Sequence, residues 1–411
     1  MTPLAVQWTR AWLQPWAERT ARWSAIALGF SIPVSTALDG MLTVLLLAAW
    51  LAAGRYRRRY EALRTSPVAL AAMALWLLYL VGMLWAGDAG GNAGEYLGKY
   101  SKLLLLPVVV TLLTDPRDRQ RALIAFAAGL LLTLLLSYAL WLGLLPPGRP
   151  FTGDAANPTV FKKHITHNVL LAFAVLLFGL LAWRAPARWM RWTWAGLAAL
   201  AASNVLLLGY ARTGYMVLAV IALTCAIHRY RWRGVVAAAL AIPVTAAALY
   251  TLAPTFHQRV ALAVGEARDW DRQRSSGTAV GLRLEYYHNT LALVRERPLL
   301  GTGTGGFPEA YAERVRGSGM EAARNPHNQY LLTAAELGVV GLAALLFLMV
   351  QHWRAGSRLM APDERLLARG LLALMVVGCL FNSLLLDHAE GLFFVWLSGV
   401  LFAALPAKPQ A

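Results

Sequence analysis

The sequence predicts an all-α polytopic membrane protein. Of its 411 residues, 58% are hydrophobic and only 14% are charged, and the mean hydropathy is +0.51. Soluble chains are usually about 25% charged, so the composition argues against a water-soluble globular enzyme. A helix that crosses the hydrocarbon core needs about 20 mostly apolar residues, and the chain holds roughly a dozen such stretches. These stretches define about 12 transmembrane helices.

Each apolar run ends at charged residues, Gly or Pro. The predicted spans are 23–38, 40–54, 67–86, 99–114, 120–143, 165–183, 192–209, 214–228, 234–252, 328–350, 368–386 and 391–405. The chain then divides into an amphipathic cytoplasmic N-terminus (1–22), nine spans (23–252), an outer helical segment (253–326), three further spans (327–405) and a cytoplasmic tail (406–411). In the outer segment, residues 281–297 are expected to form a helix that ends at Pro298.

The arginines set the expected orientation. The net charge is +17 and the pI is near 10.4. Arginine-rich connections recur around residues 55–64, 117–121, 184–191, 229–233 and 354–369. If the spans alternate, all of these connections lie on one side, and Lys/Arg excess marks the cytoplasmic side. The positive charge is therefore attributed to membrane orientation, and no nucleic-acid partner is expected.

The strongest chemical signal on the opposite, outer face is Asn325-Pro326-His327-Asn328. Asn suits an N-cap and Pro the first helical position, so His327 is expected in the first turn of a span. The positive end of the helix dipole disfavours imidazolium, and a neutral imidazole accepts a proton at pH 7. The alternative is an interfacial histidine that only hydrogen-bonds a neighbouring loop.

Two arginines on the outer face depart from the orientation pattern. Arg212 lies in the tight turn Tyr210–Gly214, and its planar fork suits phosphate oxygens, although it could instead snorkel to lipid headgroups. Arg283 lies near the start of the outer helix and shares a face with Tyr287 and Thr290. A solvated helix charge is the alternative for Arg283.

Further charged residues are expected on the outer face. Asp387 is in the last outer turn and could orient a cation or His327, or be a solvated acid. Lys162, Lys163 and His164 precede the sixth span and could attract an anionic lipid or anchor a headgroup. Lys99 and Lys102, which flank the fourth span, are interpreted in the same way.

Several apparent motifs are set aside. The run 301–306 contains G-x-G-x-x-G, but it follows a helix and no acidic residue lies at the proper distance, so a flexible turn is expected. Asp269-Trp270-Asp271 lacks the partners of an oxygen cage, and His164 with His167 lacks a third ligand. No metal site and no cofactor are expected. Two cysteines in apolar helices, Cys225 and Cys379, predict no disulfide framework.

Arginines and a neutral histidine at the outer leaflet fit a lipid-linked diphosphate, which is both a membrane-bound anion and a good leaving group. Arginines can stabilise the departing charge, and the histidine can take the proton of an attacking hydroxyl. The substrate would supply the energy, because the periplasmic side has no ATP.

These residues resemble a known family, the bacterial O-antigen ligases. His327-Asn328, nine positions and then Gly338-Val339-Val340-Gly341 are similar to the family signature, and Ala211-Arg212-Thr213-Gly214 resembles its arginine turn. Arg283 before an aromatic helix, and the run 298–307 (PLLGTGTGGF), resemble its outer segment. The G-x-x-G also has a physical use, since it allows close helix approach in lipid.

The resemblance implies transfer of O-antigen polysaccharide from undecaprenyl diphosphate to lipid A–core on the periplasmic face of the bacterial inner membrane. It implies a glycosyltransferase-C type fold and a metal-independent, inverting reaction. It also implies that His327 is the base, Arg212 and Arg283 the diphosphate clamp and Asp387 a supporting acid. Asn328, Tyr287, Lys162, Lys163 and His164 are then the expected substrate-binding residues, beside membrane lipids.

Three other functions remain open from the sequence. An O-antigen polymerase or a protein O-oligosaccharyltransferase would share the lipid-linked donor, and the acceptor is not readable from residues. A transporter or flippase of an anionic lipid is the alternative from another class. Transporters place ionisable residues near the bilayer midplane, whereas the candidate site residues of this chain are expected together at the outer surface.

Overall fold

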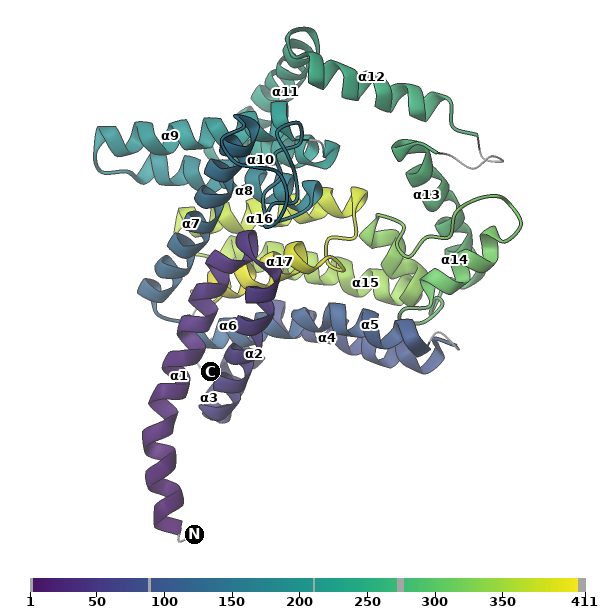
Figure 1. The fold of residues 1–411 in the computed structure, drawn as a ribbon. Coiled ribbons are helices and arrows are strands. Elements are labelled where there is room, and N and C mark those ends of the chain that lie inside the picture. The colour runs from purple at the N-terminus through teal and green to yellow at the C-terminus, as the bar shows by residue number, and fades with distance from the viewer. Residues whose placement is uncertain (1–2, 88–89, 210, 272–276, 406–411) are drawn as a thin grey trace.

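The fold is a bundle of α-helices (Figure 1). The computed structural model describes residues 3–87, 90–209, 211–271 and 277–405, and no β-strand occurs among them. The α-helices are α1 (Pro3–Val34), α2 (Thr36–Ala52), α3 (Tyr56–Arg64), α4 (Pro67–Gly82), α5 (Gly90–Tyr100), α6 (Leu105–Leu112), α7 (Pro116–Trp141), α8 (His164–Arg184), α9 (Arg188–Ser203), α10 (Arg212–Tyr230), α11 (Trp232–Leu252), α12 (Pro254–Arg268), α13 (Ala279–Glu296), α14 (Phe307–Val315), α15 (Gln329–Arg358), α16 (Pro362–Phe381) and α17 (His388–Phe402). Short helical turns are η1 (Met83–Trp85), η2 (Ser101–Leu104) and the π-helical η3 (Asn204–Leu208).

The polytopic helical class is supported, but the count of twelve spans is not. Within the described residues, six helices are long and apolar enough to cross a membrane, or seven if the bent pair α2 and α3 forms one span. Other expected spans are short, as in α9 and α17, or carry charge, as in α1 and α16. The expected span 99–114 is broken into the end of α5, η2 and α6.

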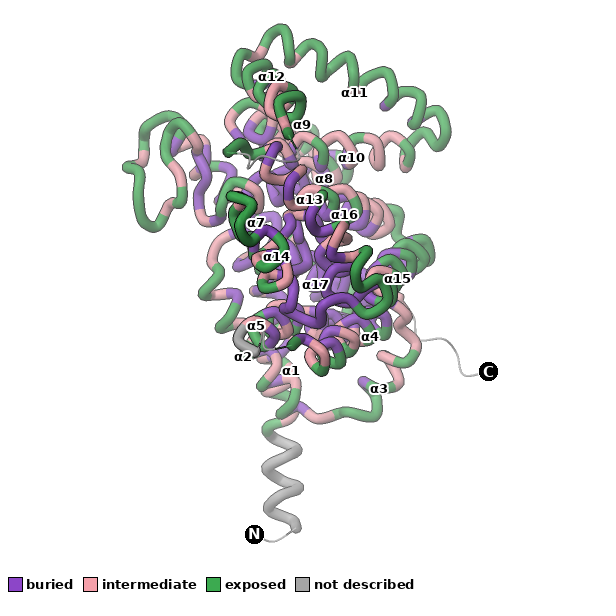
Figure 2. The backbone as a smooth tube through the Cα atoms, turned by 90° about the vertical axis from the view of Figure 1, so that its right-hand side faces the viewer, coloured by how far each residue is buried: buried purple, intermediate pink, exposed green. Residues whose placement is uncertain are grey.

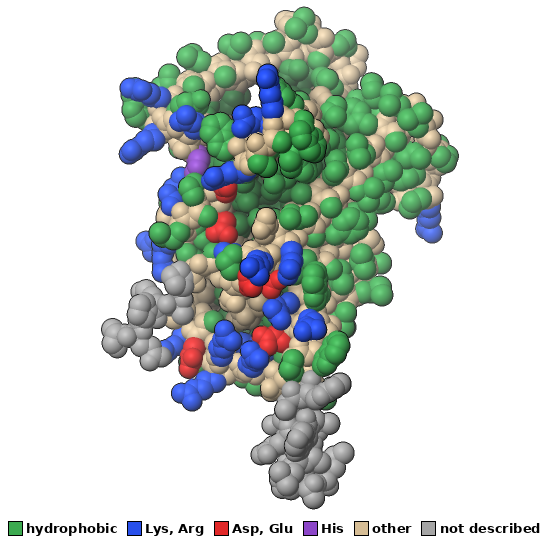
Figure 3. Space-filling view, turned by 90° about the vertical axis from the view of Figure 1, so that its left-hand side faces the viewer, with side chains coloured by type: hydrophobic (Ala, Val, Ile, Leu, Met, Phe, Trp, Pro, Cys, Tyr) green, Lys and Arg blue, Asp and Glu red, His purple; other side chains and the backbone are tan. Residues whose placement is uncertain are grey.

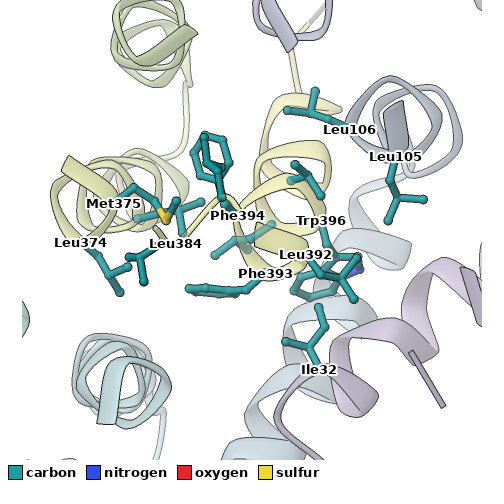
Figure 4. Close-up of a cluster of buried hydrophobic side chains, with 14 of the residues drawn as sticks. Ile32, Leu105, Leu106, Leu374, Met375, Leu384, Leu392, Phe393, Phe394 and Trp396 are labelled. Carbon is teal, nitrogen blue, oxygen red and sulfur yellow. The ribbon is translucent and has the colours of Figure 1, made fainter. Parts of the chain in front are cut away.

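Helix α17 occupies the centre of the bundle. Every residue from Ala389 to Phe402 is buried, and a helix that is apolar on all sides requires such surroundings. Figure 4 shows Phe393, Phe394 and Trp396 packed among side chains of neighbouring helices. The Trp396 indole N–H donates to the Ala25 carbonyl at 2.7 Å, which ties α17 to α1.

The periphery differs from this centre. Figure 2 shows α17 surrounded by buried backbone, whereas α11 and α12 are largely exposed. Helix α11 is apolar and almost none of it is buried inside the protein, as expected for a lipid-facing helix. On the face shown in Figure 3, Lys and Arg dominate the charged side chains.

The N-terminus does not form a separate segment. Residues 1–22 were expected to lie apart from the first span, but α1 continues without interruption from Pro3 to Val34 and packs against α2 and α7. The turn between the first two spans lies at Ser35, whose side chain caps α2 by accepting from the Leu38 N–H. Asp39, expected in that turn, is instead inside α2. The expected tail 406–411 lies outside the described residues.

The outer segment is helical in three places, α12, α13 and α14. The expected helix 281–297 is present as α13, whose first turn is capped by Thr278. Helix α13 packs against α15 and α12. It thereby positions Arg283 and Tyr287 near the start of α15.

Candidate functional site

The turn before α15 holds His327. The Asn325 carboxamide oxygen accepts from the His327 N–H at 2.7 Å and from the Ser383 hydroxyl at 2.7 Å. Asn328 is the N-cap, since its side chain accepts from the Leu331 N–H at 3.0 Å. The prediction that Asn325 caps the helix and that His327 lies in its first turn is therefore wrong. Asn325 and Asn328 are both suitable N-cap residues, and Asn328 occupies the N-cap position of α15.

The environment of His327 favours the neutral imidazole for a different reason than the helix dipole. Its backbone is left-handed, with φ +53°, and its ring stacks on Tyr286 with centroids 6.2 Å apart. Burial lowers the pKa of His327 below its usual value, and the charge of Arg283 lowers it further. The sequence predicted a neutral His327, and the lowered pKa in the structure has the same direction.

Arg212, Arg283 and Tyr287 line one small cavity of about 220 Å³. Arg212 is the first residue of α10, and the other two lie one turn apart on α13. The Tyr287 hydroxyl lies 2.8 Å from the Leu380 carbonyl oxygen and 3.2 Å from that of His327, so the cavity adjoins the histidine turn. We call this cavity the arginine pocket. Tyr210, part of the expected tight turn, lies outside the described residues.

Among the described residues that line the arginine pocket, two are arginines and none is acidic. Arg212 pairs with Glu266 of α12 at 3.3 Å, and the same carboxylate oxygen accepts from the Val280 N–H at 3.0 Å. Glu266 therefore joins α10, α12 and α13. The pKa of Arg283 is lowered by burial first and also by Arg212, yet arginine stays charged in proteins. An anion in this pocket would offset the repulsion between the two guanidinium groups.

Asp387 lies in a different cavity. It occupies the N-cap position of α17 without a side-chain capping hydrogen bond. It shares a cavity of about 830 Å³ with Lys99, Lys102 and Asn325 and does not line the arginine pocket. Burial raises the pKa of Asp387, and the nearby Lys102 opposes that rise. The Lys102 ammonium donates to the carbonyl oxygens of Asp387 at 2.6 Å and Leu386 at 3.2 Å.

The Lys162–His164 group is split by the fold. Lys162 is buried, donates to the Thr36 hydroxyl at 2.9 Å and lies 3.4 Å from the Asp39 carboxylate. These contacts indicate a structural ammonium. Lys163 and His164 are exposed at the start of α8. Of the three residues, these two are the ones accessible to a lipid headgroup.

One buried acid, Asp39, was not predicted from the sequence as part of a polar cluster. Its side chain accepts from the Ser31 hydroxyl at 2.6 Å and lies 3.4 Å from both Lys162 and the His388 ring. This group fastens α1, α2 and the loop before α8 to the start of α17. The signal was present, because an acid inside an apolar run marks a paired site.

The glycine-rich run is not a free turn, because backbone hydrogen bonds attach it to α15. Residues 298–306, which we call the clasp, bind along a break in α15. The N–H groups of Thr302 and Gly303 donate to the carbonyls of Ala335 and Glu336, both at 2.8 Å. The Val339 N–H donates to the Pro298 carbonyl, also at 2.8 Å. The clasp thus satisfies backbone groups that the break in a membrane helix leaves unpaired.

Gly338 explains where the break lies. Its φ of +63° and ψ of −160° are not helical, and this backbone region is essentially restricted to glycine. A side chain at position 338 would meet the Leu299 carbonyl. The G-x-x-G was expected to admit a neighbouring helix, but at Gly338 the close neighbour is the clasp.

In the ranges that the structure describes, no three His, Cys, Asp or Glu side chains gather in a way that would hold a metal ion. His167 is buried and its Nε2 lies 3.3 Å from the Asn204 oxygen. Cys225 and Cys379 are both free.

The model of the O-antigen ligase family matches residues 197–346, a stretch that includes Arg212, Arg283 and His327. An uncharacterized protein of Haemophilus influenzae (strain ATCC 51907 / DSM 11121 / KW20 / Rd) is 28% identical over 82 residues, which are 19% of this chain and 21% of that protein. The match therefore spans about a fifth of that relative. A chain from a structure described as "Structural coordination of polymerization and crosslinking by a peptidoglycan synthase complex" is 18% identical, with a TM-score of 0.47, and covers 83% of this chain and 96% of that one.

Proposed function

We propose that this chain is an O-antigen ligase, and the match of the O-antigen ligase family model to residues 197–346 supports the proposal. It transfers polysaccharide from undecaprenyl diphosphate to lipid A–core on the periplasmic face of the bacterial inner membrane. The observation that carries the proposal is the arginine pocket beside the His327 turn. Two guanidinium groups, one of them paired with an acid, favour a dianionic group there.

In this proposal the reaction is a direct displacement at the anomeric carbon of the donor sugar. His327 takes the proton of the acceptor hydroxyl, whose oxygen forms the new glycosidic bond from the face opposite the diphosphate. The bond between the anomeric carbon and the diphosphate oxygen breaks, and its electron pair leaves with the diphosphate. Arg212 and Arg283 stabilise that charge, and general base catalysis contributes typically about 10²–10⁴-fold.

The lowered pKa of His327 supports its role as the base, because the ring is then neutral at pH 7. Tyr287 supports the same arrangement by joining the arginine pocket to the histidine turn through its hydroxyl. Asp387, in the neighbouring cavity, is closer to lysines than to this pocket. We therefore assign it to the acceptor side of the reaction.

The test is a transfer assay with purified protein, a lipid-diphosphate glycan and one of three acceptors: lipid A–core, a second lipid-diphosphate glycan or a serine-containing peptide. We expect product on lipid A–core. Elongation of the lipid-linked glycan would identify a polymerase, and product on the peptide a protein O-oligosaccharyltransferase. Movement of intact donor across a vesicle membrane without bond cleavage would identify a flippase.

The matched variants are His327→Ala and His288→Ala. His288 is an exposed histidine of α13, so its removal takes away a histidine of the outer segment but leaves the His327 turn intact. We expect His327→Ala to lose transfer while remaining folded in detergent, and His288→Ala to retain it. Near-normal product from His327→Ala would refute the role of this residue as the base.

A further inference from the structure

The second cavity of the site is a long groove with no assigned occupant. It has a volume of about 830 Å³ and lies between α2, α4, η2, α6 and the start of α17. This volume falls in the range of about 300–1,000 Å³ that is typical of ligand sites, whereas the arginine pocket is smaller than that range. We call it the lipid groove, for the reasons that follow.

The wall of the lipid groove is apolar along one face of α2. Gly40, Val44, Leu47 and Trp50 succeed one another at intervals of three and four residues, which is the spacing of one helix face. The ten steps from residue 40 to residue 50 extend over about 15 Å at 1.5 Å per residue. Leu105, Val108 and other apolar side chains of α6 complete this wall.

The rim of the groove is cationic. Lys99, Lys102 and Arg324 line it, against one lining acid, Asp387. Lys99 and Arg324 share the carboxylate of Glu95, at 2.8 and 3.0 Å, so one acid serves two cations. The Lys102 ammonium donates two of its three protons to backbone carbonyls. The rim therefore complements a phosphorylated headgroup, and the wall complements a hydrocarbon chain.

The groove and the arginine pocket both adjoin the turn that holds His327. Asn325 lines the groove and also accepts from the His327 N–H, whereas Tyr287 lines the arginine pocket and lies against the His327 carbonyl. The two cavities have no lining residue in common. A displacement with inversion needs such an arrangement, because the nucleophile must arrive opposite the leaving group.

We propose that the lipid groove holds the membrane anchor of the acceptor, a phosphorylated acyl lipid, and so presents the acceptor hydroxyl to His327 from the side opposite the donor. This inference rests on the proposed function. The apolar face of about 15 Å matches half of a hydrocarbon core about 30 Å thick, which is the depth of one leaflet. That length suits an acyl chain better than a polyprenyl chain that is long enough to cross both leaflets.

Two glycines that line the groove have open space where a side chain would begin. A Cβ at Gly40 or at Gly98 would meet no atom within 4 Å, and both residues line the groove. Gly196 of α9 is also open but lines none of the cavities described here, so Gly196→Leu is the matched control for Gly40→Leu and Gly98→Leu.

The first measurement is transfer kinetics with each substrate varied in turn. In Gly40→Leu and Gly98→Leu, the new leucine side chain should displace about two methylenes of the acyl chain bound in the groove. The KM for lipid A–core should therefore rise about tenfold, and the KM for the donor should not change. Gly196→Leu should match the unsubstituted protein. A rise confined to the KM for the donor, or no rise in either KM, would overturn the inference while leaving the ligase function intact.

The second measurement is photo-crosslinking from a photoreactive amino acid at Leu47 in proteoliposomes. We expect cross-links to radiolabelled lipid A–core, reduced when its phosphates are removed. Cross-links to the undecaprenyl donor instead, or to neither lipid, would overturn the inference. If the unsubstituted protein transfers no glycan to lipid A–core at all, it is the proposed function that fails.

Discussion

Replacing Gly338 with Ala should release the clasp from α15. At φ +63° and ψ −160°, an added Cβ would overlap the Leu299 carbonyl and lie 2.6 Å from the Leu300 nitrogen. These atoms are backbone, so no flexible side chain can move aside to accept the methyl group. The clasp would have to shift and lose the hydrogen bond from the Val339 N–H to the Pro298 carbonyl.

The expected cost has two parts. A non-glycine residue in this backbone region costs about 1–3 kcal/mol. Loss of a net hydrogen bond adds about 0.5–1.5 kcal/mol, so the free energy of unfolding should fall by roughly 2–4 kcal/mol. The shift should also lower transfer activity, because the clasp follows directly from α13, which carries Arg283.

The assay is denaturant unfolding in detergent together with the transfer assay. Gly179→Ala in α8 is the control, since a Cβ there meets open space and alanine favours a helix over glycine by up to about 1 kcal/mol. We expect Gly338→Ala to be destabilised and Gly179→Ala to be unchanged or slightly more stable. Equal stability of Gly338→Ala and the unsubstituted protein would refute the assignment of the clasp as a rigid attachment.

Two further predictions concern the arginine pocket and the histidine. Arg212→Lys should lose about tenfold or more in kcat, because the charge remains but the planar fork of the guanidinium is lost. The exposed control Arg268→Lys should keep full activity. If Arg212→Lys were as fast as the unsubstituted protein, the charge alone would suffice. Since the pKa of His327 is lowered, the neutral base persists into more acidic solution, and the acid limb of kcat/KM should lie below pH 6.5, the usual value for histidine. A limb at or above that pH would contradict the assigned environment.

The sequence predicted those parts of the site that depend on local patterns. Residue type and local pattern predict the planar fork of Arg212 and its place in a turn at the start of a helix. Helical spacing predicts that Arg283 and Tyr287 share one face. The structure brings all three residues into one pocket. The signature containing His327 lies inside the stretch that matches the O-antigen ligase family. Its role as the base stays a prediction.

The sequence failed where long-range backbone pairing decides the structure. Pro298 and Val339 are forty-one positions apart, and nothing in a glycine-rich run reveals that it pairs with a distant helix. Glycine is compatible with both a flexible turn and a close backbone contact, so composition alone could not separate them. The helix start shifted from Asn325 to Asn328 for a similar reason, because the Ser383 hydroxyl that engages Asn325 comes from another part of the chain.

The span count failed because hydropathy measures composition and not continuity. Residues 99–114 are apolar enough to suggest one helix, yet Lys102 turns inward to the carbonyls of Leu386 and Asp387 where the helix is broken. An irregular backbone at membrane depth is stable only against protein or a cavity that satisfies its polar groups. The break also contributes a cation to the lipid groove, since the same η2 turn carries Lys102, which lines the cavity. The helix break at η2, which hydropathy did not predict, therefore places the Lys102 ammonium in the groove where the phosphorylated headgroup is proposed to bind.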